Sequence, residues 1–252
     1  MDLGLKDKHI LITGGSRGIG KAIAKQFVDE GAKVSIVGRT LAMLEDVKQE
    51  LGDIDIYQAD VTNKQDRENL MEQFLRDNES IDVLVNNAGG SSGSTVLNTE
   101  LEAFYESFEY NYFSAVHLCQ LAVSEMVKQG SGNIVNIASI YGRESGGLVT
   151  YNNAKAALIS FTKSLANEVV KKGVNVNSIA PGSVYHEAGV WHRRMNENPE
   201  MINKFIENEI PAGRFGTPEE IAQAVVFLAS DKASWIAGAC VTVDGAQSRS
   251  NI

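Results

Sequence analysis

The stretch HILITGGSRGIG, residues 9–20, decides the fold of this chain. Its first five residues are the short apolar run of a buried strand, and the glycines behind them mark a tight turn. Residues 20–31, GKAIAKQFVDEG, then follow the spacing of an amphipathic helix. A strand, a glycine turn and a helix in this order predict the first unit of a parallel α/β sheet.

The glycine turn has the composition of a phosphate-binding loop. Its glycines follow the spacing G-x-x-x-G-x-G over residues 14–20, which differs from the G-x-G-x-x-G fingerprint. Glycines permit a close backbone approach, and the start of a helix offers free N–H groups to a phosphate. Simple turn chemistry is the alternative, but the position after the first strand favours a dinucleotide. The residues of the turn that we expect to bind it are Gly14, Ser16, Arg17, Gly18, Ile19 and Gly20.

The remaining chain alternates short apolar runs with helical patterns. Further strands are predicted at residues 33–38, 54–59, 81–88, 133–139, 174–180 and 239–245. Further helices are predicted at residues 41–51, 64–77, about 100–128, 151–171 and 218–230. We therefore predict an α/β protein with a doubly wound Rossmann fold, in which helices cover both faces of a parallel sheet of about seven strands. Residues 1–252 form a single dinucleotide-binding and catalytic domain in this prediction. The longest irregular stretch, residues 181–201, overlaps a predicted substrate lid at about 183–210.

The composition restricts the partners and the compartment. A formal net charge of −9 argues against nucleic acid and anionic membranes as partners, because both favour basic proteins. Cys119 and Cys240 lie in apolar contexts, so we expect buried thiols rather than a disulfide or a metal site. The chain has no signal-peptide pattern and no apolar run near the roughly 20 residues of a membrane span, which predicts a soluble, cytoplasmic protein.

The end of the second predicted strand indicates which dinucleotide binds. NAD-binding proteins commonly have an acidic residue there, which bonds the ribose hydroxyls. This chain has Gly38, Arg39 and Thr40 instead. Arg39, together with Arg17 from the glycine turn, suits a 2′-phosphate through charge-assisted hydrogen bonds, whereas arginines that face solvent are the alternative. We therefore favour NADP(H) over NAD(H).

The sequence YNNAK, residues 151–155, places a phenol and an ammonium four residues apart. Positions i and i+4 of a helix share one face, with Cβ atoms roughly 5–6 Å apart. A nearby cation lowers the pKa of a phenol, so Tyr151 and Lys155 can form a general acid and base near neutral pH. A surface tyrosine and a solvated lysine are the alternative for this spacing alone.

The glycine turn, NNAG at residues 86–89 and YNNAK, in this order, resemble the short-chain dehydrogenase/reductase family over nearly the whole chain. The resemblance implies a nicotinamide dinucleotide as the cofactor. It assigns Asp60 to the adenine, the NNAG residues to the adenosine side of the pocket and the pair Pro181-Gly182 to the nicotinamide. The cofactor-binding residues that it adds are Asp60, Val61, Asn87, Ala88, Gly89, Tyr151, Lys155, Pro181, Gly182 and Val184.

The same resemblance implies a catalytic group of four residues. Ser139 and Tyr151 hydrogen-bond the substrate oxygen, and Tyr151 donates a proton to it in reduction and removes one in oxidation. Lys155 lowers the pKa of the phenol and holds the nicotinamide ribose. Asn111 positions a water that leads from Lys155 to solvent. A simple strand end at Ser139 and a helix cap or kink at Asn111 are the structural alternatives.

The sequence does not decide the role of the polar segment between Ser139 and Tyr151. Tyr141, Arg143 and Glu144 can contact the substrate, or Arg143 and Glu144 can pair with each other at the surface.

The predicted lid also allows two interpretations. We expect Trp191 to cover the substrate. The two interpretations concern His192, Arg193 and Arg194, which either attract an anionic group or form a solvated basic face. His186 stands where members of the family often have threonine, which puts one contact to the nicotinamide in doubt.

Residues 213–245 resemble the same region of 3-oxoacyl-carrier-protein reductases and of sugar or polyol dehydrogenases. We therefore expect an NADP(H)-dependent oxidoreductase that interconverts a ketone and a secondary alcohol by hydride transfer. A 3-oxoacyl-type substrate, a sugar or polyol, and another small alcohol all remain open. A non-catalytic dinucleotide sensor is a further alternative, although it would predict loss of the tyrosine, lysine or serine. The family usually forms homotetramers, so we expect a homotetramer or a homodimer.

Overall fold

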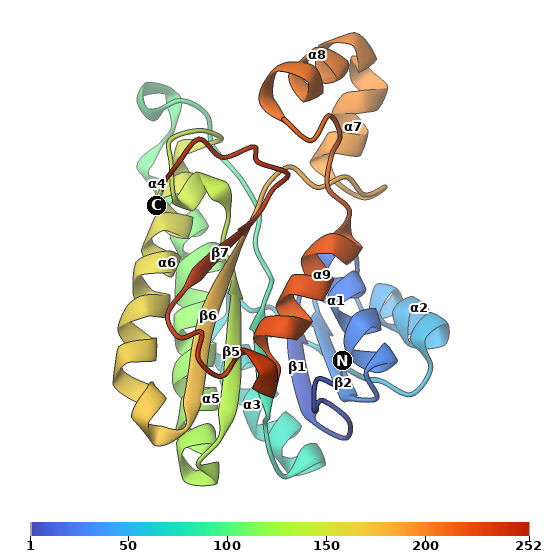
Figure 1. Ribbon diagram of the computed structural model, residues 1–252, viewed down its shortest axis with the longest axis vertical. Coiled ribbons are helices and arrows are strands. Elements are labelled where there is room, and N and C mark those ends of the chain that lie inside the picture. Colours follow the sequence, from blue (N-terminus) through green and yellow to red (C-terminus); the bar gives the residue numbers. More distant parts are fainter. Residues whose placement is uncertain (1, 252) are drawn as a thin grey trace.

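The computed structural model describes residues 2–251, and within them seven parallel strands form one sheet in the order β3-β2-β1-β4-β5-β6-β7 (Figure 1). The strands are β1 His9–Thr13, β2 Lys33–Gly38, β3 Asp55–Gln58, β4 Val83–Asn86, β5 Gly132–Ile137, β6 Val174–Pro181 and β7 Cys240–Val243. The strand order reverses between β1 and β4, and ligands of such sheets bind beyond the carboxyl ends of the strands at this point. The predicted doubly wound Rossmann fold is confirmed.

Helices cover both faces of the sheet (Figure 1). The α-helices are α1 Gly18–Asp29, α2 Leu41–Leu51, α3 Lys64–Asn78, α4 Leu101–Phe108, α5 Ser114–Gln129, α6 Val149–Val169, α7 Val190–Glu197, α8 Pro199–Glu209 and α9 Pro218–Leu228. The shorter elements are the 3₁₀ turns η1 Val96–Asn98, η3 Ile140–Gly142, η4 Val170–Lys172 and η5 Asp231–Ala233, and the π-helix η2 Glu109–Phe113. Helices α1, α2 and α9 contribute to the apolar core on one face, and α3, α5 and α6 to the core on the other.

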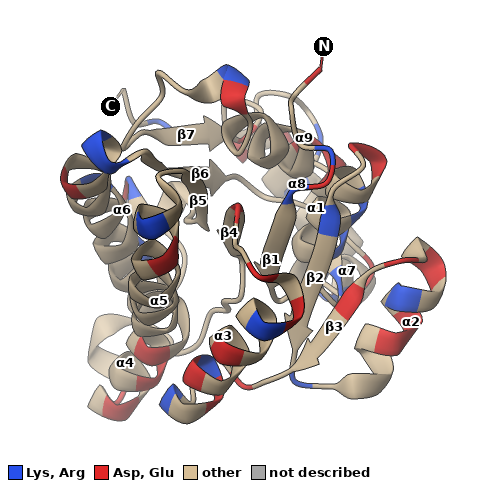
Figure 2. Cartoon of the chain, turned by 90° about the horizontal axis from the view of Figure 1, so that it is seen from below, with Lys and Arg blue, Asp and Glu red and all other residues tan. Residues whose placement is uncertain are grey.

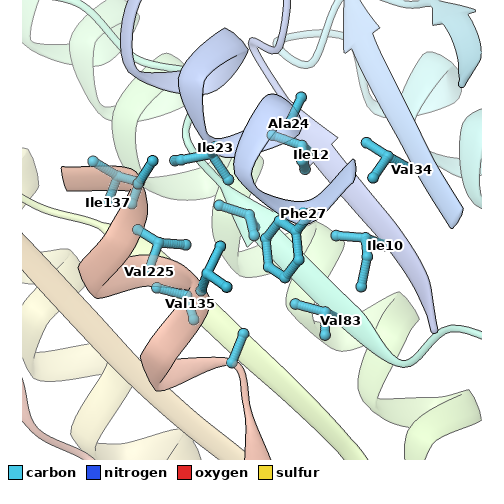
Figure 3. Close-up of a cluster of buried hydrophobic side chains, with 14 of the residues drawn as sticks. Ile10, Ile12, Ile23, Ala24, Phe27, Val34, Val83, Val135, Ile137 and Val225 are labelled. Carbon is cyan, nitrogen blue, oxygen red and sulfur yellow. The ribbon is translucent and has the colours of Figure 1, made fainter. Parts of the chain in front are cut away.

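The central strand β1 explains why HILIT is apolar at nearly every position. Ile10 and Ile12 point into the core beneath α1 and α9, beside Phe27, whereas Leu11 belongs to the core on the opposite face (Figure 3). All four side chains are fully buried. Burial of each such side chain stabilises the fold by about 1.5–3 kcal/mol, so a strand buried on both faces needs an unbroken apolar run.

Charged residues lie mainly on the helices, and strands β5, β6 and β7 carry none (Figure 2). No helix within residues 2–251 is both long and apolar enough to cross a membrane. Cys119 is buried as predicted, but Cys240 on the edge strand β7 is only partly buried, and both thiols are free.

Two parts of the secondary structure differ from the prediction. The helix predicted at about 100–128 is divided into α4 and α5 by the π-helix η2, because the chain accommodates an extra residue there. The predicted irregular stretch contains α7 and leads directly into α8. Helix α8 begins with Pro199 after Asn198, whose side chain accepts a hydrogen bond from the backbone of Met201 at 3.0 Å. An asparagine cap followed by proline is a helix start signal that the prediction missed.

Two glycines, Gly130 after α5 and Gly173 after the 3₁₀ turn η4, give a matched stability test. Gly130 and Gly173 both adopt left-handed conformations, with φ of +72° and +84°. A Cβ at Gly130 meets nothing within 4 Å, whereas a Cβ at Gly173 overlaps the carbonyl oxygen of Gly130. We predict that Gly130→Ala costs about 1–2 kcal/mol of unfolding free energy, and Gly173→Ala at least about 3 kcal/mol because the backbone must also shift. Urea unfolding measures both, and equal losses would contradict the steric argument.

Candidate active site

A cavity of about 700 Å³ opens beyond the carboxyl ends of the strands. The glycine turn after β1 forms one part of its wall, and the ends of β2, β4, β5 and β6, the start of α6 and residues 186–194 form the rest. The predicted residues that line it are Gly14, Ser16, Arg17, Gly18, Ile19, Gly20, Arg39, Val61, Asn87, Ala88, Gly89, Ser139, Tyr151, Lys155, Pro181, Gly182 and Val184. Of the predicted site residues, only Asp60 and Asn111 lie outside the cavity wall.

Asn87 fastens the glycine turn to the end of β4. Its side-chain amide donates to the backbone oxygens of Thr13 at 3.0 Å and Gly14 at 3.1 Å. In return, the Thr13 hydroxyl accepts hydrogen bonds from the backbone N–H groups of Asn87 and Ala88, each at 3.0 Å. A Cβ at Gly20 would overlap the Gly14 oxygen and approach the Asn87 amide to 2.5 Å. The third glycine of the turn is therefore needed for this packing.

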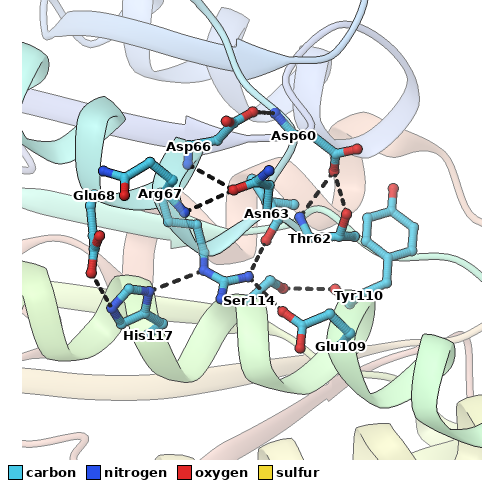
Figure 4. Close-up of polar contacts among 12 residues, drawn as sticks. Asp60, Thr62, Asn63, Asp66, Arg67, Glu68, Glu109, Tyr110, Ser114 and His117 are labelled. Atoms are coloured by element: carbon cyan, nitrogen blue, oxygen red, sulfur yellow. Dashed lines mark hydrogen bonds and ion pairs between the residues drawn. The ribbon is translucent and has the colours of Figure 1, made fainter.

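Asp60 does not line the cavity, and its carboxylate bonds the neighbouring Thr62 (Figure 4). Its carboxylate accepts hydrogen bonds from the Thr62 backbone at 3.0 Å and the Thr62 hydroxyl at 2.8 Å. Partial burial acts to raise the pKa of Asp60, but these hydrogen bonds and the nearby Arg39 and Arg67 lower it overall. The adjacent Val61 lines the cavity, so the segment lies at the wall even though the carboxylate does not.

Arg67, which the sequence did not mark as important, supports this end of the cavity from behind. Its guanidinium donates to the Val61 carbonyl oxygen at 2.6 Å and to Glu109 at 2.7 Å (Figure 4). The side chain is 6% exposed. Arg67 therefore connects the segment after β3 to the π-helix that carries Asn111.

Arg17 and Arg39 both line the same end of the cavity. Arg17 precedes α1, and Arg39 follows β2, where its guanidinium carbon lies 5.8 Å from the centre of the Tyr110 ring. No aspartate or glutamate is among the described residues of the wall. This end of the cavity is therefore positively charged.

Ser139, Tyr151 and Lys155 meet at the other end. Ser139 follows β5, and Tyr151 and Lys155 lie one turn apart near the start of α6. The Lys155 ammonium lies 5.6 Å from the centre of the Tyr151 ring and donates to the Ile137 carbonyl oxygen at 2.7 Å. The predicted pairing of phenol and ammonium on one helix face is therefore present.

Burial dominates the acidity of both groups. It lowers the pKa of Lys155 to about 8. It raises the pKa of Tyr151, and a hydrogen bond with Ser139 offsets part of this effect. The pKa of the phenol is therefore raised, which is opposite to the predicted lowering by Lys155, because the removal of water penalises the phenolate.

Asn111 lies in the π-helix and is 1% exposed. Its side-chain oxygen accepts from the Gly90 N–H at 2.9 Å, and its amide donates to the oxygens of Gly90 at 2.9 Å and Ser107 at 3.0 Å. A Cβ at Gly89 would lie 2.8 Å from the Asn111 oxygen and 3.2 Å from the Lys155 nitrogen. Asn111 and Lys155 therefore both approach Gly89 on the side where a Cβ would lie, and only Lys155 lines the cavity.

His186 packs against the glycine turn. A Cβ at Gly18 would lie 2.8 Å from its imidazole ring. Burial, followed by the charge of Arg17, lowers the pKa of His186, so the ring is neutral at pH 7. Its Nδ1 atom is buried and has no hydrogen-bond partner among the described residues.

Arg143 and Glu144 follow neither of the two predicted alternatives. Arg143 donates to the carbonyl oxygen of Cys240 at 2.8 Å, and Glu144 accepts from the Ser248 hydroxyl at 3.0 Å. Neither residue lines the cavity, whereas Tyr141 does. The two charged residues fasten the segment after β5 to the carboxyl-terminal part of the chain.

Helices α7 and α8 lie together at one end of the molecule, apart from the helices that cover the sheet (Figure 1). Trp191 lines the cavity and stacks on Phe205, with 4.7 Å between ring centres. His192 shares a hydrogen bond of 2.8 Å with the Tyr185 hydroxyl. Arg194 is the member of the predicted basic run that lines the cavity.

Several wall residues carry no sequence signal. They are mostly apolar and include Met43, Tyr110, Ile140, Leu148 and Val190. They reach the cavity because they neighbour a strand end or a helix start, which no motif marks. Among residues 2–251, no group of three or more His, Cys, Asp or Glu residues is placed to hold a metal ion.

Comparison with known proteins gives matches over almost the whole chain. The family model described as Enoyl-(Acyl carrier protein) reductase matches residues 14–246. The 3-oxoacyl-(acyl-carrier-protein) reductase FabG of Chlamydia muridarum is 37% identical, with 96% of this chain and 97% of the relative covered. Carbonyl reductase family member 4 of Xenopus laevis is 34% identical, with 94% of this chain and 97% of the relative covered.

A comparison with solved structures also finds a match over almost the whole chain. The crystal structure of L-sorbose reductase from Gluconobacter frateurii, complexed with NADPH and L-sorbose, matches with a TM-score of 0.94 and 31% identity. The match covers 99% of this chain and 100% of that chain. The chain therefore belongs to the short-chain dehydrogenase/reductase family and is an oxidoreductase that acts on CH–OH or C=O groups.

Proposed function

We propose that this enzyme interconverts a ketone and a secondary alcohol with NADP(H), using Tyr151 as the acid and base. The observation that carries the proposal is the arrangement of one cavity. Ser139, Tyr151 and Lys155 line one end, and a glycine turn with two arginines lines the other. A non-catalytic sensor would have no use for the first group.

The residues present fit a nicotinamide dinucleotide. The glycine turn opens α1, whose first N–H groups can bind a pyrophosphate. Arg39 lies where an acidic residue would favour NAD(H), and it suits the 2′-phosphate of NADP(H). The remaining cofactor contacts are assigned to the predicted residues, and Asp60, which bonds Thr62, lies outside the wall beside Val61. When bound, the dinucleotide supplies or accepts the hydride.

The polar groups at the other end handle the proton. In reduction, the Tyr151 hydroxyl donates its proton to the carbonyl oxygen, which Ser139 also holds by a hydrogen bond. The raised pKa of Tyr151 keeps the phenol protonated, which is the form that reduction requires. The Lys155 ammonium stabilises the phenolate that remains after transfer.

Asn111 is assigned to the proton path from Lys155. Its side-chain oxygen and the Lys155 nitrogen approach the same side of Gly89, which supports a water that leads from the lysine to solvent. Its bonds to Gly90 and Ser107 fix its orientation.

We further propose that residues 183–210, part of the same single catalytic domain, act as the substrate lid.

The comparisons support two substrate classes. The FabG relatives favour a 3-oxoacyl-type ketone, and the L-sorbose reductase favours a sugar or polyol. We place the 3-oxoacyl class first, because several relatives named for it match at 34–37% identity. The sugar or other small-alcohol class is the alternative.

We also propose a homotetramer, or a homodimer as the smaller alternative. Large apolar side chains lie exposed on two separate parts of the molecule, which suits more than one contact between subunits. Leu97 and Trp235 are 95% and 98% exposed, and Leu101 and Tyr105 on α4 are also exposed.

Tyr151→Phe tests the proposed acid and base. We predict that kcat for ketone reduction falls by about 10²–10⁴-fold, because the ring stays but the proton donor is lost. NADPH affinity, measured by fluorescence titration, should be nearly unchanged. Tyr141→Phe, in another ring of the same wall, should lose far less activity. Retention of most activity in Tyr151→Phe would overturn the assignment.

Arg39→Ser tests the cofactor. We expect the Kd for NADPH to rise about tenfold or more, because a charge-assisted contact to the 2′-phosphate is lost. The Kd for NADH should change little. The exposed Arg76 of α3 gives the matched control, and Arg76→Ser should affect neither cofactor. A wild-type enzyme that binds NADH more tightly than NADPH would contradict the choice.

The pH dependence of reduction should reflect Lys155. Because burial lowers the pKa of Lys155 to about 8, its ammonium predominates below that pH and is lost above it. The phenol does not titrate in this range, since its pKa is raised. We therefore predict that kcat/KM for ketone reduction falls as the pH rises through about 8. A profile that stays flat well above this pH would contradict the role of the ammonium.

A further inference from the structure

One cation in the cavity wall has no role in the proposed function. The described wall carries Arg17, Arg39, Lys155 and Arg194 but no aspartate or glutamate, although the chain has a net charge of −9. The proposed function uses Arg17 and Arg39 for the phosphates of the dinucleotide and Lys155 for the proton. The proposed function assigns no role to Arg194.

The guanidinium of Arg194 has no carboxylate partner among the described residues. Its one described contact is with the face of Trp191, with 5.1 Å from the guanidinium carbon to the ring centre. A cation–π contact of this kind leaves the N–H donors free for another acceptor. The neighbouring Arg193 differs, because it pairs with Glu197 at 3.8 Å and does not line the cavity.

Trp191 gives Arg194 a fixed support. Its ring lies 4.7 Å from that of Phe205 and 5.0 Å from that of Phe215, centre to centre. Phe215 is buried in the same small core with Ile202. The arginine therefore rests on a packed aromatic cluster rather than on a free loop.

Arg194 is within electrostatic reach of the catalytic end of the cavity. Burial raises the pKa of Tyr141, as do Glu209 and Glu144, while Arg194 lowers it. Tyr141 lines the cavity two residues after Ser139. The charge of Arg194 therefore acts on a residue of the wall beside the place where the reacting carbonyl is expected.

The two acids near Tyr141 are already engaged. Glu209 pairs with Arg249 at 3.1 Å, and Glu144 accepts from the Ser248 hydroxyl at 3.0 Å. Neither lines the cavity. An anion beside Arg194 would therefore meet an unpaired cation in the wall, with both nearby carboxylates bound elsewhere.

We propose that Arg194 binds an anionic group of the substrate, a carboxylate or a phosphate, while the ketone carbonyl of the same molecule lies at Ser139 and Tyr151. The inference rests on the proposed function and narrows its substrate class to ketones that carry a negative charge. The planar guanidinium fork binds either anion through two parallel hydrogen bonds.

Matched pairs of ketones test the proposal. Acetoacetate is compared with acetoacetamide for the carboxylate, and dihydroxyacetone phosphate with dihydroxyacetone for the phosphate. The wild-type enzyme should have the higher kcat/KM for the charged member of at least one pair, and that pair identifies the anion. Arg194→Gln should lower kcat/KM for that charged member by about 10- to 100-fold and leave the neutral member unchanged.

Three controls make the result specific. Arg193→Gln, on the same helix, should leave the preference intact, and Arg194→Lys should restore part of it because a cation is present. The Kd for NADPH should be the same in Arg194→Gln and in the wild type. Equal losses for both members of a pair, no preference in the wild type, or weaker NADPH binding as the main effect would each overturn the proposal.

Calorimetric binding of the same four ketones separates this proposal from the proposed function. A preference for the charged ketone that Arg194→Gln abolishes supports the anion site even if no ketone is turned over, and absent turnover would then contradict only the proposed reaction. Turnover of the ketones with no such preference in binding or kinetics overturns the anion site alone.

Discussion

The hydrogen bonds between Asn87 and the glycine turn are the constraint on which the site depends. They join the ends of β1 and β4, the two strands where the order of the sheet reverses. The turn that begins α1 is thereby held at a fixed place beside the segment that leads to Gly89. Because Lys155 and Asn111 both approach Gly89, the glycine turn and the group of Ser139, Tyr151 and Lys155 are held in a fixed relation to each other.

Burial sets the protonation states of Lys155 and Tyr151. A lysine in water keeps its proton far above neutral pH, but Lys155 is 3% exposed and its pKa falls to about 8. The same surroundings keep the Tyr151 phenol protonated. An ammonium and a neutral phenol therefore coexist near pH 7, and the main-chain oxygen of Ile137 holds the ammonium in place. Packing that stabilises the fold and packing that sets the acidity are here the same contacts.

Local patterns predicted most of the sheet and the wall of the cavity. HILIT and YNNAK carry their information in short-range spacing, so the strand β1 and the pairing of Tyr151 with Lys155 followed directly. The direction of the pKa shift of Tyr151 could not be predicted from spacing, because desolvation depends on residues that surround the ring from distant parts of the chain. Arg67 was missed for the same reason: its partner Glu109 lies 42 residues away.

The π-helix η2 has a consequence for how the region around Asn111 can vary. One extra residue in a helix shifts the residues on either side by about 100° relative to each other, so α4 and α5 are out of phase. Helix α5 can bury Leu118 and Cys119 against the sheet while α4 presents Leu101 and Tyr105 outward. Deletion of a single residue here would bring the two helices back into phase and turn one of these faces the wrong way. The segment therefore tolerates exchanges of side chains far better than changes of length.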